Sequence, residues 1–135
     1  MTNLKGGCKC GAIEFGGEVD VAFTANCHCT DCQQFTGAAF ATLVFVSEDG
    51  FAVQGDVGEY RHESDRGSIL TKTFCPVCGS PLFSRTTARA GLVGVRIGAI
   101  RDNHVYPPAR NIYCTSALPS TAMDPAIPKF DKMPG

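Results

Sequence analysis

The sequence predicts a mainly β protein, built from short antiparallel strands with little helix. Short runs rich in Val, Ile, Phe, Leu and Thr recur along the chain, and glycine-containing turns separate them at intervals typical of all-β domains. No long segment keeps the apolar repeat of about 3.6 residues that an amphipathic helix needs. Most of the eight cysteines fall in three tight clusters, which indicates that metal ions tie these strands together.

The expected strands are the runs with the strongest β preference, bounded by turn sequences such as Glu48-Asp49-Gly50. They cover residues 12–15, 39–46, 51–54, 68–74, 81–84 and 92–97. One short helical turn is expected at residues 30–35, where Asp31 caps the turn and favours a helix N-terminus. A single domain is expected over residues 1–135, with an irregular, proline-rich segment from about residue 107 that covers the sheet.

The charge of the chain is nearly balanced, with a net value of −1. This gives no electrostatic reason to expect nucleic acid or an anionic membrane as a partner. No apolar run reaches the roughly 20 residues of a membrane span, and the start lacks the apolar stretch of a signal peptide, so a cytoplasmic location is expected. Thiols stay reduced there, so clustered cysteines favour metal binding over disulfides.

The segment Cys75-Pro-Val-Cys-Gly79 predicts a metal-binding turn, because two thiols this far apart can both reach one ion at about 2.3 Å. Gly79 allows the left-handed backbone of such a turn. A redox dithiol is the alternative, but no βαβ pattern surrounds the pair. A closed zinc site needs two further ligands, and Cys8 and Cys10 can supply them, since residues two apart in an extended segment face the same side. The other interpretation of these four thiols is buried free cysteines.

A third cluster places three thiols within six residues, at Cys27, Cys29 and Cys32. Three protein ligands with an open fourth position are typical of catalytic zinc. A fourth protein ligand would make the site structural, and the candidates are Cys114, His62 and His104. Cys114 is otherwise expected to be a small buried hydrophobic residue. His28 is expected to point away from the metal and either to support a ligand or to lie at the surface.

Three segments together resemble a known family: Gly6-Gly-Cys-Lys-Cys-Gly11, Cys27-His-Cys-Thr-Asp-Cys32 with Thr36-Gly37, and Phe74-Cys-Pro-Val-Cys-Gly79. They look like the signature segments of the glutathione-dependent formaldehyde-activating enzyme family, which is grouped with CENP-V domains. The similarity covers roughly residues 6–112. It implies an Mss4-like zinc-bound β fold and two zinc ions per chain. The structural zinc would be bound by Cys8, Cys10, Cys75 and Cys78, and the catalytic zinc by Cys27, Cys29 and Cys32.

The resemblance also implies a carbon–sulfur lyase that condenses formaldehyde with glutathione to S-(hydroxymethyl)glutathione. A glutathione-like thiol is then the expected partner. This chain departs from the family where basic residues often follow the third cluster, because it carries Gln33-Gln34 there, and it has no tryptophan. Four arginines are candidates to hold the carboxylates of such a thiol instead, although scattered surface arginines are the simpler interpretation: Arg85, Arg89, Arg96 and Arg110.

Three functions are therefore open at the level of sequence. The first is a zinc-dependent carbon–sulfur lyase with an open metal position at the third cluster. The second is a non-catalytic binding or scaffold module in which both zinc ions are structural. The third is a thiol or metal sensor, whose three-cysteine cluster releases zinc on oxidation. The sequence does not specify the substrate or the oligomeric state.

Overall fold

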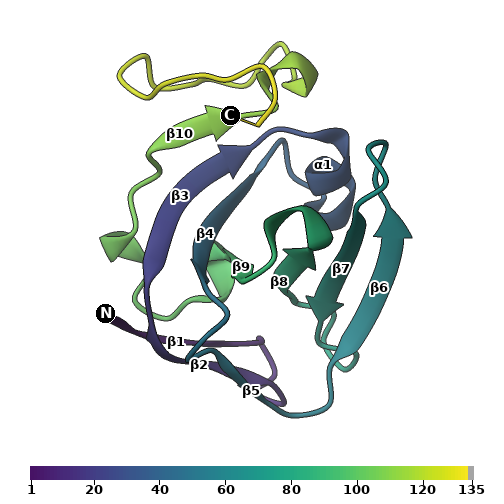
Figure 1. The fold of residues 1–135 in the computed structure, drawn as a ribbon, viewed down its shortest axis with the longest axis vertical. Helices are drawn as coiled ribbons and strands as arrows, with labels where there is room; N and C mark the ends of the chain where they lie inside the picture. Colours follow the sequence, from purple (N-terminus) through teal and green to yellow (C-terminus); the bar gives the residue numbers. More distant parts are fainter. Residues whose placement is uncertain (134–135) are drawn as a thin grey trace.

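The computed structural model describes residues 1–133, and the last two residues of the predicted domain lie outside this range. The described chain is mainly β, as predicted, with two sheets and one short α-helix (Figure 1). The elements are β1 (Thr2–Gly7), β2 (Glu14–Val19), β3 (Val21–Cys27), α1 (Thr30–Thr36), β4 (Ala41–Ser47), β5 (Ala52–Gln54), β6 (Gly58–Glu63), β7 (Ile69–Phe74), β8 (Pro81–Thr86), η1 (Thr87–Arg89), β9 (Leu92–Arg96), η2 (Ile97–Ala99), η3 (Asn103–Val105), β10 (Arg110–Ile112) and η4 (Cys114–Ser116).

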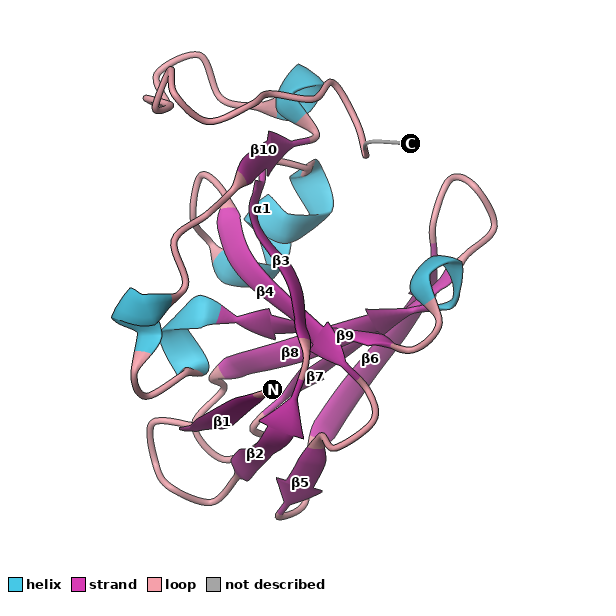
Figure 2. Cartoon of the chain, turned by 60° about the vertical axis from the view of Figure 1, so that its left-hand side comes forward, coloured by secondary structure: helices cyan, strands magenta, loops and turns pink. Residues whose placement is uncertain are grey.

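The larger sheet has seven strands in the order β10-β3-β4-β9-β8-β7-β6. All neighbours in it are antiparallel except β10, which runs parallel to β3. The smaller sheet has the order β1-β2-β5 and lies below the larger sheet in Figure 2. Helix α1 connects β3 to β4 and lies near the end of the larger sheet where β10 and the C-terminal segment are found.

The six expected strands are all present, with ends shifted by up to a few residues, and the expected helical turn is α1. Four further strands escaped prediction: β1, β3, β6 and β10. Strand β6 reads Gly-Glu-Tyr-Arg-His-Glu and owes its conformation to pairing with β7, not to intrinsic β preference. The segment beyond residue 107, expected to be irregular throughout, contains β10 because its backbone pairs with β3.

Two apolar cores lie on opposite faces of the larger sheet. The first lies between the two sheets and includes three aromatic rings, Phe15, Phe51 and Phe83, whose centroids are 5.1–5.7 Å apart. Each such ring pair adds about 0.5–1.5 kcal/mol beyond its area burial. The second core lies on the face of α1 and the C-terminal segment. Strand β4 contributes to both, with Val44 and Val46 in the first and Leu43 and Phe45 in the second.

Each cysteine cluster lies against one of these cores. Cys75 belongs to the first core and Cys8 packs against it. Cys27 and Cys32 belong to the second core, with Cys29 packed against it. The two clusters are therefore on different faces of the larger sheet and have different surroundings. Within the described part of the chain, no helix combines the length and the apolar character that crossing a membrane requires.

Helix α1 is fixed to the larger sheet by a buried ion pair. Lys72 on β7 donates its Nζ hydrogen to the Asp31 carboxylate, with side-chain exposures of 6% for the lysine and 34% for the aspartate. His62 Nε2 lies 3.5 Å from the same carboxylate oxygen, and the Lys72 ammonium lies 5.3 Å from the Phe35 ring centroid. This contact locates the first turn of the helix on β7.

The expectation that Asp31 caps the helix is wrong. Cys29 is the N-cap residue, and its Sγ accepts a hydrogen bond from the Cys32 backbone amide at 3.2 Å. Asp31 lies in the first turn, where a negative charge still favours the helix dipole, but its carboxylate is directed to Lys72. The helix ends at Gly37, whose φ of +70° is the left-handed conformation that glycine adopts without strain.

Replacing Lys72 by methionine is expected to lower the free energy of unfolding by about 1–3 kcal/mol, because Asp31 loses its partner in a partly buried position. Chemical denaturation at matched zinc content measures this loss. The matched control is Arg61→Met, since Arg61 and Glu59 form an exposed pair at 3.9 Å and its loss costs at most about 0.5 kcal/mol. Equal effects of the two substitutions would show that Lys72 does not anchor the helix.

Candidate metal centres

The first cluster brings together four thiols from the ends of two hairpins. Cys8 and Cys10 follow β1, and Cys75 and Cys78 follow β7. Their sulfur atoms all lie within 4.8 Å of one another, with 3.6 Å between Cys8 and Cys10 and 3.7 Å between Cys10 and Cys75. Four sulfurs that bind one tetrahedral zinc at about 2.3 Å are about 3.8 Å apart. The donor set and its spacing fit zinc.

Backbone and hydroxyl donors surround the sulfurs of this cluster. The Ile13 amide donates to Cys8 Sγ at 3.2 Å, and the Cys78 amide donates to Cys75 Sγ at 3.5 Å. The Ser80 hydroxyl lies 3.1 Å from Cys78 Sγ, and this contact lowers the pKa of the Cys78 thiol to about 5. Such donors stabilise thiolates, which are the form that binds metal.

The second cluster is local in sequence and lies where β3 passes into α1. Its three sulfurs lie within 4.8 Å of one another, and belong to Cys27, Cys29 and Cys32. Cys27 and Cys32 are buried, whereas Cys29 is half-buried and lies at the helix N-terminus. Hydrogen bonds from the Cys27 and Cys32 thiols lower the pKa of Cys29 to about 2, and the contact with Cys29 raises the pKa of Cys27. One thiolate at Cys29 with two thiol donors is thus the favoured state of the metal-free cluster.

Within residues 1–133, no further His, Cys, Asp or Glu side chain joins this group of three. The candidate fourth ligands lie in other surroundings. Cys114 is half-buried and its Sγ lies 3.5 Å from the Asn111 carbonyl oxygen. His62 faces Asp31, and His104 lies in η3.

His28 is buried, with 1% of its surface exposed, so the expectation of a surface position is wrong. Its Nε2 lies 3.0 Å from the Asn111 side-chain oxygen, and its ring lies 5.0 Å from that of Phe40. The side chain therefore connects the three-cysteine segment to β10. Asn111 was not identifiable from the sequence, because only the parallel pairing of β10 with β3 brings the two residues together.

The C-terminal segment covers the three-cysteine cluster. Gln33 donates from its side-chain amide to the His28 carbonyl at 2.9 Å and to the Ser116 carbonyl at 3.0 Å. This glutamine, a departure from the family pattern, thus ties α1 to η4. Tyr113 packs against the second core with a φ of +58°, and burial, followed by the nearby charges of Cys27 and Cys29, raises the pKa of its phenol.

The four arginines singled out from the sequence have different surroundings. Arg85 pairs with Glu48 at 2.9 Å. Arg89 and Arg110 both lie over the Phe23 ring, at 5.8 Å and 4.4 Å from its centroid. Arg96 is buried, so its interpretation as a surface residue is wrong.

Comparison with known proteins adds two relatives. A protein of Aspergillus terreus, provisionally named a glutathione-dependent formaldehyde-activating enzyme, is 28% identical over 88 residues. The match spans 62% of this chain and 46% of the relative, so the chain covers less than half of that protein. A crystal structure of a Rhodobacter sphaeroides protein aligns with a TM-score of 0.56 over 93% of this chain and 98% of that one, at 18% identity. This second likeness shows a shared fold.

The family model described as glutathione-dependent formaldehyde-activating enzyme matches residues 3–116. The matched range contains both cysteine groups as well as α1 and β10. It covers most of the chain, and the signature segments lie inside it. The chain belongs to the glutathione-dependent formaldehyde-activating enzyme family.

Proposed function

We propose that this protein is a zinc-dependent carbon–sulfur lyase of the glutathione-dependent formaldehyde-activating type, with its reaction centre at Cys27, Cys29 and Cys32. The observation that carries the proposal is the convergence of three sulfurs without a fourth protein ligand among the described residues. A three-ligand zinc keeps a position for substrate, whereas the four-thiol cluster is complete and suits a structural role. Thiolate donors favour zinc over the harder divalent ions.

In the proposed reaction, the sulfur of a small thiol attacks the carbon of formaldehyde. A carbon–sulfur bond forms, the carbonyl π bond breaks, and the thiol proton ends on the oxygen to give a hydroxymethyl thioether. Zinc bound at the three-cysteine cluster would supply a Lewis acid that favours the thiolate form of the substrate. Each atom of the two reactants is retained in the product, so no oxidant or reductant is needed.

The residues of the chain prepare this site in two ways. Cys29 is the half-buried member of the cluster, so the approach of a small thiol is expected on its side, while Cys27 and Cys32 are enclosed by the second core. The Cys32 amide and the anchored first turn of α1 keep the Cys29 sulfur in place. Apolar side chains around the cluster limit the access of water, which strengthens electrostatic interactions at the reacting sulfur.

Native mass spectrometry of the purified protein, with and without glutathione, tests the proposal directly. We expect two zinc ions per chain and a glutathione adduct that is absent in Cys29→Ser. An assay of S-(hydroxymethyl)glutathione formation is expected to show a loss of at least about a hundredfold in the same variant. Two zinc ions without an adduct would instead favour the non-catalytic binding module.

The two clusters are expected to respond differently to loss of a ligand. Cys78→Ser should leave the chain largely unfolded, because metal binding at a closed site is worth about 10–16 kcal/mol, comparable with the whole stability of a domain. Cys29→Ser should retain the fold, since serine also serves as an N-cap and replaces the sulfur acceptor for the Cys32 amide. Circular dichroism and thermal unfolding compare the two variants. If Cys29→Ser unfolds as completely as Cys78→Ser, the open-site proposal fails.

A further inference from the structure

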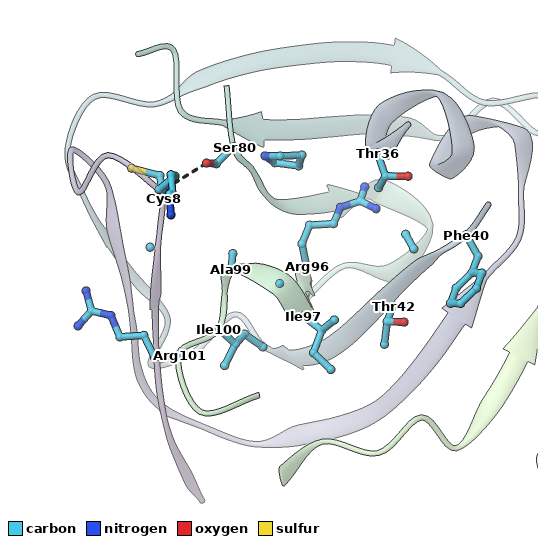
Figure 3. A pocket seen from close by; sticks show the side chains of 15 residues that line it. Cys8, Thr36, Phe40, Thr42, Ser80, Arg96, Ile97, Ala99, Ile100 and Arg101 are labelled. Atoms are coloured by element: carbon cyan, nitrogen blue, oxygen red, sulfur yellow. Dashed lines mark hydrogen bonds between the residues drawn. The ribbon is translucent and has the colours of Figure 1, made fainter. Parts of the chain in front are cut away.

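A cavity of about 690 Å³ lies between the four-thiol cluster and the C-terminal end of α1 (Figure 3). Its wall includes Cys8 and Ser80 on one side and Thr36 and Phe40 on the other. The charged side chains among its described lining residues are all basic, namely Lys9, Arg96 and Arg101. The charge of this lining favours an anionic occupant.

Arg96 is the basic residue of this cavity that lacks a counter-charge. It is 6% exposed, and its Nε and Nη1 atoms are buried without a hydrogen-bond partner among residues 1–133. Its guanidinium carbon lies 4.9 Å from the Phe35 ring centroid, and Figure 3 shows the side chain directed toward Thr36. Buried charges are costly unless they are paired, so an unpaired arginine in a cavity wall indicates a missing anion.

Other basic residues nearby already have partners. Lys72 pairs with Asp31, and Arg101 pairs with Glu14 at 3.2 Å. In the described chain no carboxylate lies within ion-pair distance of Arg96. An incoming carboxylate would therefore meet a guanidinium that still has free donors.

The cavity also adjoins the three-cysteine cluster. Thr36, in its wall, donates its hydroxyl hydrogen to the Cys32 carbonyl at 2.7 Å. Ala41, also in the wall, is the cross-strand partner of Cys27. Phe35, which stacks under the Arg96 guanidinium, lies one helical turn after Cys32. A small molecule can thus reach both Arg96 and the cluster.

We propose that Arg96 is the carboxylate-binding residue of this site and selects thiols that carry a carboxylate a few bonds from the sulfur. The inference rests on the proposed function, because it takes the sulfur of the same molecule to the three-cysteine cluster. The planar guanidinium matches a carboxylate in shape and charge. A neutral thiol of the same size leaves the buried charge uncompensated and binds more weakly.

The test is calorimetric binding to the zinc-loaded protein of mercaptopropionate and of its neutral amide. The wild type is expected to bind the acid at least about tenfold more tightly, as is typical of a hydrogen-bonded charge pair. Arg96→Gln should abolish this preference, and Arg96→Lys should restore part of it. Arg85→Gln is the matched control, since Arg85 is already paired with Glu48, and it should retain the preference.

Equal affinity of the wild type for acid and amide would overturn the proposal without any variant. Retention of the preference in Arg96→Gln would also overturn it. So would loss of zinc from Arg96→Gln, measured by metal analysis, because the arginine would then serve to balance the charge of the cluster.

Propionate, which has no thiol, separates this inference from the proposed function. If propionate binds through Arg96 and the thiols bind no more tightly, the carboxylate site stands and the thiol chemistry fails. If both thiols bind equally well and far more tightly than propionate, the proposed function stands and the role of Arg96 fails.

Discussion

The meeting of four cysteine sulfurs at the junction of two sheets is the constraint on which the rest of the structure depends. Cys8 and Cys10 end the first strand of the small sheet, while Cys75 and Cys78 form the turn between two strands of the large one. Close packing of these sulfurs fixes the small sheet over one face of the large sheet. The aromatic core between the sheets then fills the enclosed space, so the metal-binding turns and the apolar side chains specify the same arrangement.

The three-cysteine cluster depends on that frame but is held by different contacts. A seven-residue helix is too short to be stable alone, and its position comes from the Lys72–Asp31 pair below it and from Gln33 and His28 at the C-terminal segment. These contacts come from three separate parts of the chain. The cluster is therefore local in sequence, but its environment is created by the tertiary fold.

This difference explains what could be predicted from the sequence. The two cysteine groups follow from short spacings, and the mainly β fold follows from residue preferences within short windows. The partners of those cysteines do not. Lys72 lies 41 residues from Asp31, and His28 lies 83 residues from Asn111, so no local pattern links them. Arg96 resembles any surface arginine in the sequence, and only the packing of β9 against α1 reveals that it is buried.

The parallel pairing of β10 with β3 has a consequence for the order in which the protein is assembled. The three cysteines, the helix and the sheet strands β4 to β9 all precede β10 in the chain, so they leave the ribosome before the segment that covers the cluster. Until that segment docks, the buried thiols of Cys27 and Cys32 remain open to the surrounding solution. Synthesis thus provides an interval in which an ion can enter, and the arrival of the last strand closes the route behind it.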